Sequence, residues 1–133
     1  MTLLGLDIGS SSIKAGILRD GKIVGPVARE SFPTRYDGVR AEVDPAAIMR
    51  AIVSAIRDLP QANTVDAIAL SVMAPSWLAM DKRGRAITPI VTHQDRRSVE
   101  IATRLLRDVG KRKLLGITGN LPFPGGISST TCG

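Results

Sequence analysis

Cysteine and aromatic residues are scarce in this chain. Its 133 residues include a single cysteine, Cys132, which excludes an intrachain disulfide framework and favours a reducing compartment. Aromatic residues make up 3%, too few for the stacked platform that binds single-stranded nucleic acid. No apolar run approaches the length of a membrane span, and Asp7 interrupts the first one, so no signal peptide is evident. We therefore expect a cytoplasmic protein.

The remaining composition is that of an ordinary folded domain with a basic excess. Hydrophobic residues make up 44% and charged residues 23%, and 133 residues suffice for one domain with a buried core. The formal net charge of +6 favours an anionic ligand or partner. The basic cluster that supplies much of this charge is typical of a solvated helix face, with a nucleic-acid surface as the alternative. Its members are Arg96, Arg97, Arg104, Arg107, Lys111, Arg112 and Lys113.

The stretch from Leu3 to Leu18 is the one around which the chain is organised. Two apolar segments with the pattern of β-strands flank a tight turn rich in glycine and serine. Asp7 lies at the end of the first segment. Gly9 can adopt a positive φ, and the backbone amides that follow it then converge on a hollow that suits phosphate. A carboxylate beside such a hollow suits a hydrated Mg²⁺, which needs few protein ligands.

An ordinary β-hairpin turn has the same Asp-x-Gly-Ser pattern, so this alternative stays open. The stretch is not a P-loop, which requires Gly-Lys-Ser/Thr at the start of a helix. It is not a dinucleotide fingerprint either, because a second strand follows the turn. A nucleotide bound here would therefore lie across a hairpin.

The N-terminal third is predicted to be a three-stranded antiparallel meander. Asp20-Gly21 is a favoured hairpin dipeptide, and Ile23–Glu30 supplies the third strand. We expect Phe32 to Glu42, which carries proline, glycine and charges, to form a surface loop. Val65 to Val72 is expected to be the most buried strand, with a helix covering its small-residue face.

Two helices are predicted from capping residues and apolar periodicity. Asp44 is a typical N-cap, Pro45 a typical first helical residue, and Pro60 lies just past the helix end. The second helix is predicted from Arg96 to Val109, with Gly110 as its terminator. The positions predicted to face inward are Ile48, Ala51, Ile52, Ala55, Ile56 and Leu59 in the first helix and Ile101, Leu105, Leu106 and Val109 in the second.

Shorter elements are expected around these helices. Trp77–Met80 and Ala86–Val91 have strand patterns, and the intervening Asp-Lys-Arg-Gly is a turn. Lys111–Leu115 is expected to add a helical turn, and Gly116–Gly133 consists largely of turn-forming residues. Three antiparallel strands, a helix, a strand and a helix indicate a mixed α/β order, which corresponds to half of an actin-like nucleotide-binding fold.

Six stretches carry motifs that belong together: Gly5–Lys14, Glu42–Pro45, Ile68–Ser71, Asp81–Ala86, Asp95–Arg97 and Ile117–Asn120. Together they resemble motifs of the FGGY carbohydrate kinases, in particular the xylulokinase- and gluconokinase-like members. The resemblance implies an α/β, actin-like ATPase (ribonuclease H-like) domain. Its mixed sheet starts with a three-stranded antiparallel meander and is incomplete here. Residues 1–133 would form the N-terminal part of the first actin-like domain of a sugar kinase, whose second domain is absent from this chain.

The resemblance implies ATP-dependent phosphorylation of a sugar or polyol hydroxyl. Asp7 would hold Mg²⁺ through water, while backbone amides and a lysine would neutralise the transferred phosphate. Strand alternation places Lys14 on one face with Ser12 and Gly16, and a solvent-facing strand lysine is the alternative for Lys14. The implied phosphate-binding residues are Gly9, Ser10, Ser11, Ser12 and Lys14.

Sugar contacts implied by the resemblance come from two places in the chain. One is the segment Met73–Trp77, with Ala74 and Pro75, and the other is Asp95 with Arg97. Asp95 would accept two hydroxyl hydrogen bonds while Arg97 holds it in place; a helix N-cap aspartate with a surface arginine is the alternative. Family members that act on xylulose or glycerol carry polar residues where this chain has Ala74-Pro75, which argues against both substrates.

The largest departure from the family is length. The family's aspartate that deprotonates the sugar hydroxyl, and its adenosine-binding residues, lie beyond the position of Gly133, so we expect the chain to be inactive alone. His93 replaces a tryptophan usual in the family and is either a substrate contact or structural. Expected partners are a sugar or polyol, the remainder of the kinase chain and a second copy of this chain, without nucleic acid or membrane. The alternatives are a non-catalytic actin-like regulatory module that binds sugar or phosphate, and a small basic nucleic-acid binder.

Overall fold

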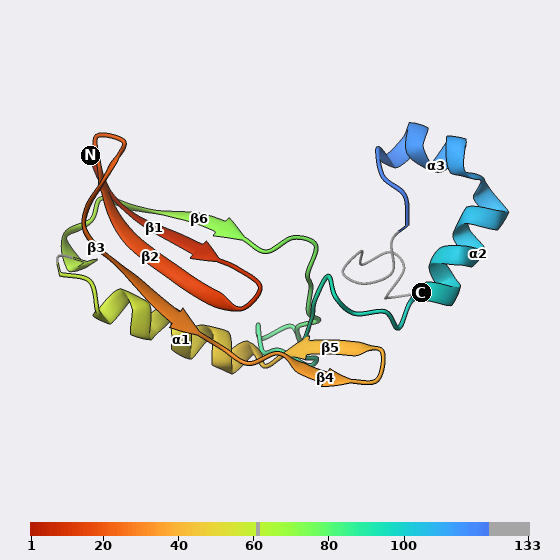
Figure 1. Cartoon of the computed structure of the whole chain (residues 1–133), viewed down its shortest axis with the longest axis horizontal. Helices are drawn as coiled ribbons and strands as arrows, with labels where there is room; N and C mark the ends of the chain where they lie inside the picture. Colours follow the sequence, from red (N-terminus) through yellow and green to blue (C-terminus); the bar gives the residue numbers. More distant parts are fainter. Residues whose placement is uncertain (61, 123–133) are drawn as a thin grey trace. The chain divides into compact units, whose positions relative to one another are not determined.

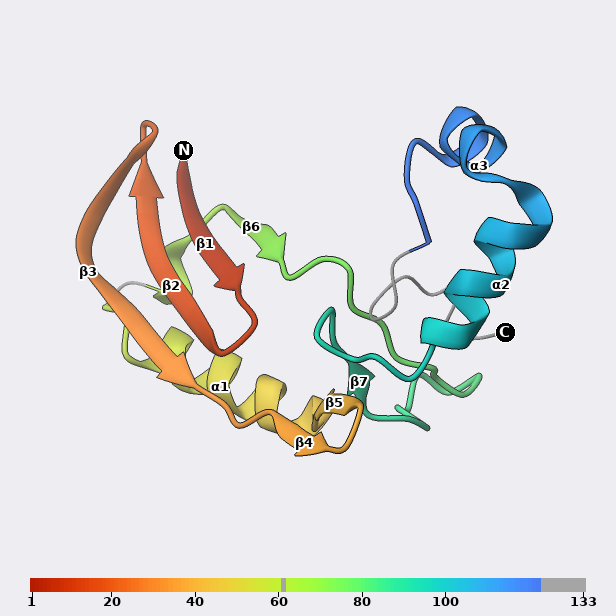
Figure 2. The same cartoon turned by 45° about the vertical axis from the view of Figure 1, so that its right-hand side comes forward.

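The computed structural model describes residues 1–60 and 62–122, which divide into two compact units (Figures 1 and 2). The first unit comprises Met1–Pro33 and Asp44–Met73. The second comprises Thr34–Val43 and the described residues from Ala74 onward. Within the described residues, no helix is both long and apolar enough to cross a membrane.

A four-stranded mixed sheet forms the first unit. Its strands are β1 (Thr2–Ile8), β2 (Ser12–Arg19), β3 (Lys22–Ser31) and β6 (Ala67–Val72). Their order is β3-β2-β1-β6, with β1 antiparallel to β2, β2 antiparallel to β3, and β6 parallel to β1. The predicted meander is confirmed. Asp20 and Gly21 both adopt positive φ at the β2–β3 turn, which matches the right-handed twist of the strands.

Helix α1 (Pro45–Arg57) covers one face of β2 and β3, as Figure 2 shows. The predicted cap is confirmed, because the backbone N–H of Ala46 donates to Asp44 Oδ1 at 2.9 Å and Pro45 occupies the first turn. Alternate residues of β1 and β2 point toward the helix and form the core with it. The buried core residues of this unit include Leu4, Leu6, Ile13, Ala15, Ile17, Ile48, Ala51, Ala55 and Leu59.

The prediction that the fourth strand is the most buried is wrong for the described structure. All residues of β6 are exposed, so the predicted helix cover over its small-residue face is also wrong, and Ile68, Leu70 and Val72 retain 59–65% of their accessible surface. They pair with Leu4, Leu6 and Ile8 of β1, so they lie on the core face of the sheet. Helix α1 contacts β2 and β3 and leaves the core face of β6 uncovered.

The second unit contains a small antiparallel sheet where a surface loop is predicted. Its strands β4 (Arg35–Asp37), β5 (Arg40–Val43) and β7 (Ile90–Val91) lie in the order β4-β5-β7. Gly38 has φ 55° at the tip of the β4–β5 hairpin. The glycine and charges that indicate a loop therefore belong to a hairpin, which is held by partners about fifty residues further along the chain.

The two strands predicted on either side of the Asp81 turn are mostly absent. Only Ile90–Val91 forms a strand, and isolated bridges join Trp77 to Val91 and Met80 to Ala86. The turn itself is confirmed: Asp81 Oδ1 accepts hydrogen bonds from the backbone N–H groups of Arg83 and Arg85 at 2.8 and 2.9 Å. Carboxylate oxygens fold such turns by substituting for a backbone acceptor.

Two further helices, α2 (Val99–Val109) and α3 (Lys111–Thr118), are joined at Gly110, which has φ 86°. Helix α2 begins at Val99, three residues later than predicted, and Ser98 is its N-cap. Its buried residue is Ala102, and the four predicted inward residues are only partly covered. Helix α3 extends past the predicted single turn into the tail, where residues 123–133 lie outside the described part of the chain.

Candidate functional site

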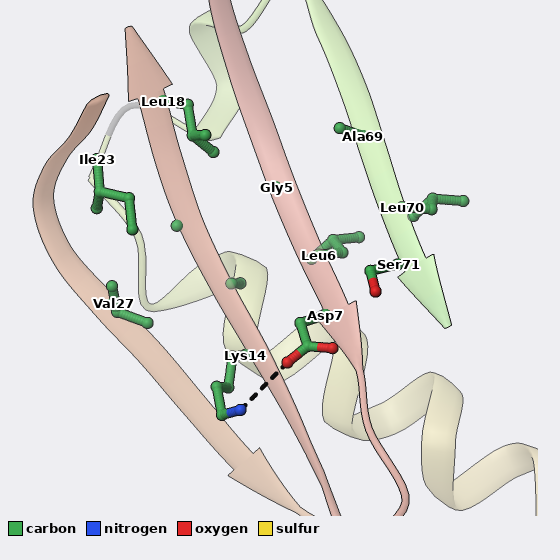
Figure 3. A pocket seen from close by; sticks show the side chains of 12 residues that line it. Gly5, Leu6, Asp7, Lys14, Leu18, Ile23, Val27, Ala69, Leu70 and Ser71 are labelled. Atoms are coloured by element: carbon green, nitrogen blue, oxygen red, sulfur yellow. Dashed lines mark hydrogen bonds and ion pairs between the residues drawn. The ribbon is translucent and has the colours of Figure 1, made fainter. Parts of the chain in front are cut away.

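The end of β1 carries an ion pair that spans two strands. Asp7 and Lys14 are directly opposite each other in the β1–β2 register, and Lys14 Nζ donates to Asp7 Oδ2 at 3.1 Å (Figure 3). Their side chains retain 49% and 51% of their accessible surface. An exposed pair of this kind contributes about 0–1 kcal/mol to stability, so both groups are available to a ligand.

The turn between β1 and β2 has free backbone N–H donors, but they do not depend on the positive φ predicted for Gly9. Gly9 does not adopt a positive φ. The position favours glycine because a Cβ would lie 3.1 Å from the carbonyl oxygen of Ser12, a close contact with the same oxygen that accepts a hydrogen bond from the Gly9 N–H. Ser10 and Ser11 are exposed, and within the described residues their backbone N–H groups have no acceptor. Ser12 is buried at the start of β2. The turn therefore presents two adjacent amides to solvent.

A hollow of about 400 Å³ lies beside the ion pair in the first unit. Gly5, Gly16 and Ala69 are among its lining residues, on the sheet face opposite α1. Apolar side chains of β2 and β3 border it (Figure 3). A Cβ on Gly5 would lie 2.7 Å from Leu18 Cδ1. Its lining is mostly apolar, and the charged groups lie together at the Asp7 end.

The chemistry of this end suits a metal-bound phosphate. One carboxylate, one ammonium group and two free amides provide a ligand for a cation beside donors for an anion. Within the described residues, no three acidic, histidine or cysteine side chains cluster to bind a metal. A single carboxylate such as Asp7 suits Mg²⁺, which keeps several of its waters and takes few protein ligands.

The second group of candidates, Asp95 and Arg97, lies in the second unit, where the structure brings the two side chains together. Asp95 is fully buried. Its Oδ1 accepts from the Arg97 backbone N–H (3.0 Å) and Nε (2.9 Å), and its Oδ2 accepts from Arg97 Nη2 (2.7 Å) and the Ala41 N–H (2.9 Å). Asp95 is not the cap of α2, and Arg97 is half-buried, so the alternative of a helix cap with a surface arginine is wrong.

Glu42 completes this group, although it is not among the site residues predicted from the sequence. Its buried carboxylate accepts hydrogen bonds from Arg97 Nη2 and, at 2.7 Å, from Arg35 Nη2. Glu42 lies in a stretch that matches a family motif, but its partner Arg97 is 55 residues away. Two buried carboxylates therefore face two guanidinium groups, and the four charges cancel.

These contacts set the protonation of the group. The hydrogen bond from Arg97 is the main reason that the pKa of Glu42 is lowered, against the opposing effect of burial. Burial alone would raise the pKa of Asp95, but the hydrogen bonds from Arg97 and from the Ala41 amide outweigh it and the pKa is lowered. The hydrogen bond to Asp95 is the main reason that the pKa of Arg97 is raised. All three groups are therefore charged at neutral pH.

The remaining candidate residues flank the isolated β-bridge between Trp77 and Val91. Trp77 and Val91 exchange backbone hydrogen bonds of 3.1 and 2.8 Å, so the chain leading into Trp77 runs antiparallel to the chain leaving Val91. Ala74 and Pro75, both exposed and joined by a cis peptide, precede the bridge, and His93 follows it. Within the described residues, the buried Ser76 Oγ and Trp77 Nε1 atoms have no hydrogen-bond partner.

The sequence profile of the FGGY family of carbohydrate kinases, N-terminal domain, matches residues 2–129. The chain belongs to the FGGY family. A comparison with curated proteins gives no match. The family assignment therefore rests on the profile, and the fold agrees with it.

Solved structures of FGGY kinases share the fold. A xyloylose kinase from Brucella ovis is 28% identical with a TM-score of 0.87 over 98% of this chain and 28% of its own. A xylulose kinase from Rhodospirillum rubrum is 25% identical with a TM-score of 0.81 over 92% of this chain and 26% of its own. Plasmodium falciparum glycerol kinase with ADP is 15% identical, with a TM-score of 0.78 over 92% of this chain and 26% of its own. The expected mixed α/β, actin-like ATPase fold is confirmed, and the chain spans about a quarter of each FGGY structure.

Proposed function

We propose that this chain is the N-terminal part of the first actin-like domain of an ATP-dependent carbohydrate kinase. The observation that supports this most directly is the Asp7–Lys14 pair beside the two free amides of the β1–β2 turn. The family match supports a sugar kinase domain, and the reaction is phosphoryl transfer from ATP to a hydroxyl of a sugar or polyol. The single cysteine fits a cytoplasmic enzyme.

The phosphate site is the end of β1. Asp7 would hold Mg²⁺ through water, and the metal when bound neutralises charge on the phosphate oxygens. Lys14 Nζ would donate to the transferred phosphate, and the amides of Ser10 and Ser11 would donate to its oxygens. The protein's share of the chemistry is to position the phosphate and to stabilise its charge.

The sugar site is assigned to the two segments that flank the Trp77–Val91 bridge. Ala74 and Pro75 supply an apolar wall, and the turn that contains His93 lies along the opposite segment. The four hydrogen bonds already accepted by Asp95 support a role in holding this turn, with Arg97, rather than direct contact with a hydroxyl. This assignment favours sugars with an apolar edge toward Ala74-Pro75 over xylulose or glycerol.

The test is sugar-dependent ADP formation by the product of the complete reading frame, measured with a panel of pentoses, hexonates and polyols. We expect turnover with at least one of them, and none from residues 1–133 alone, because the catalytic base is expected beyond Gly133. ADP formation by residues 1–133 would refute the inactivity of the fragment. Sugar or phosphate binding without turnover in the complete product would replace the kinase with a non-catalytic regulatory module.

A further inference from the structure

We propose that Glu42 is a positioning residue of the sugar site, which acts through Arg97 on the turn Thr92–Asp95. The inference rests on the proposed function, because the turn flanks the segment assigned to sugar binding. Glu42 itself lies on β5 with only 5% of its surface exposed, so it does not offer its carboxylate to a ligand. Its proposed role follows from the hydrogen bond that its carboxylate accepts from Arg97.

The Glu42 carboxylate is the second anchor of Arg97. Arg97 Nη2 donates both to Glu42 Oε1 and, at 2.7 Å, to Asp95 Oδ2, so one guanidinium group bridges two buried carboxylates. Removing a partner from such a group leaves buried charge uncompensated, and the remaining side chains rearrange. Without the negative charge of Glu42, Arg97 loses one of its two anionic partners, and its guanidinium group is no longer held in the position from which it binds Asp95.

Asp95 in turn fixes the turn that carries His93. The backbone N–H of Asp95 donates to the Thr92 carbonyl at 3.1 Å and closes the turn, with His93 and Gln94 at its centre. Thr92 Oγ1 donates to the Ala41 carbonyl at 3.0 Å, and Asp95 Oδ2 accepts from the Ala41 N–H at 2.9 Å. The residue that precedes Glu42 on β5 therefore holds the turn by its backbone, while Glu42 holds it by its side chain.

A second link joins the hairpin to the same turn. Tyr36 of β4 donates its hydroxyl hydrogen to Gln94 Oε1 at 2.6 Å, at an exposed position. Besides the backbone contacts of Ala41, two links between side chains thus join the β4–β5 hairpin to the turn: the buried charged link of Glu42 through Arg97 and the exposed neutral link of Tyr36. The turn follows Val91, and Ala74-Pro75 precede Trp77 on the paired segment. Loosening either link therefore moves the turn relative to Ala74-Pro75, and we expect weaker sugar binding.

The experiment compares steady-state kinetics of the product of the complete reading frame with those of three variants, using the sugar found in the panel. Glu42→Gln keeps the shape and removes the charge, and we expect KM for the sugar to rise about ten- to a hundredfold, as for other small misplacements. Tyr36→Phe should raise it by a smaller factor. Neither variant should change KM for ATP. Arg50→Gln, which removes the exposed Asp44–Arg50 pair, is the control and should match the wild type.

Each outcome decides the proposal. In one outcome, the kcat of Glu42→Gln decreases in proportion to its folded fraction while KM for the sugar stays unchanged. This result would show a purely structural role for Glu42 and would overturn the proposal. If Glu42→Gln does not fold, Tyr36→Phe decides, because its exposed hydroxyl is not needed for folding, and an unchanged KM for the sugar then overturns it. Absence of sugar-dependent turnover in the wild type refutes the proposed function, and with it this inference.

Discussion

Asp7 and Lys14 neutralise each other at half-exposed positions, so their mutual contact matters little for folding and much for what either can bind. Lys14→Met should change the free energy of unfolding by less than ~1 kcal/mol. It should raise KM for ATP about tenfold or more, because a hydrogen bond to a charged group contributes ~1.5–3 kcal/mol. Thermal denaturation and steady-state kinetics of the complete enzyme measure the two effects.

Lys22→Met is the matched control for this prediction. Lys22 is an exposed strand lysine at the start of β3, and no ion pair to the described residues is found for it. Its loss should leave both stability and KM for ATP unchanged. An equal effect of the two substitutions would show that Lys14 contributes only general positive charge, and would remove it from the phosphate site.

The buried carboxylates Glu42 and Asp95 make stability depend on acid pH. Their pKa values are lowered in the folded chain, so the stability they contribute is fully present above the unfolded values of about 4.3 and 3.9. It is lost as the pH falls through the lower folded values. We expect Tm to hold between about pH 5 and 7 and to decrease below about pH 4. Glu42→Gln should make that decrease shallower; an unchanged profile would exclude Glu42 as a contributor.

At the scale of elements, α1 depends on its cap. Asp44→Ala removes the side-chain acceptor of the Ala46 N–H and should lower the free energy of unfolding by about 1 kcal/mol. Asp44→Ser keeps an oxygen at the cap and should remain close to the wild type. Urea denaturation measures both variants. Equal losses would mean that the charge of Asp44, rather than its capping bond, stabilises the helix.

Local signals explain which elements could be predicted from the sequence. The meander follows from alternation and from the Asp20-Gly21 turn, and α1 follows from Asp44 and its periodicity, because each signal acts over a few residues. The β4–β5 hairpin could not be predicted, since its strands are short and polar and its fixing contacts come from Asp95 and Arg97.

The same distinction between local signals and distant contacts applies to the residues of the candidate site. Strand alternation predicts that Lys14 and Gly16 share one face of the sheet. The structure confirms this, because both residues line the hollow, and the register places Lys14 opposite Asp7. Glu42 could not be assigned, because pairing with Arg97 across 55 residues leaves no local pattern. The apolar residues on one face of β6 and the small residues on the other predict burial, but such a pattern shows only that a partner could cover the strand, not that the partner is present.

At the scale of the whole molecule, the uncovered core face of β6 is the feature with the clearest consequence. Ile68, Leu70 and Val72 form an apolar stripe in line with the core residues of β1, and contiguous exposed apolar surface promotes association. We expect residues 1–133, purified alone, to bind a hydrophobic dye and to associate as concentration rises. Leu70→Lys should reduce both effects, as measured by dye fluorescence and light scattering.

The same substitution should have the opposite consequence in the product of the complete reading frame. There a stripe that is covered by further chain would bury the introduced ammonium group in apolar surroundings, and the free energy of unfolding should fall by several kcal/mol. Ile87→Lys, at another exposed apolar position in the second unit, is the control and should be neutral in both proteins. A neutral Leu70→Lys in the complete product would show that the stripe faces solvent there too.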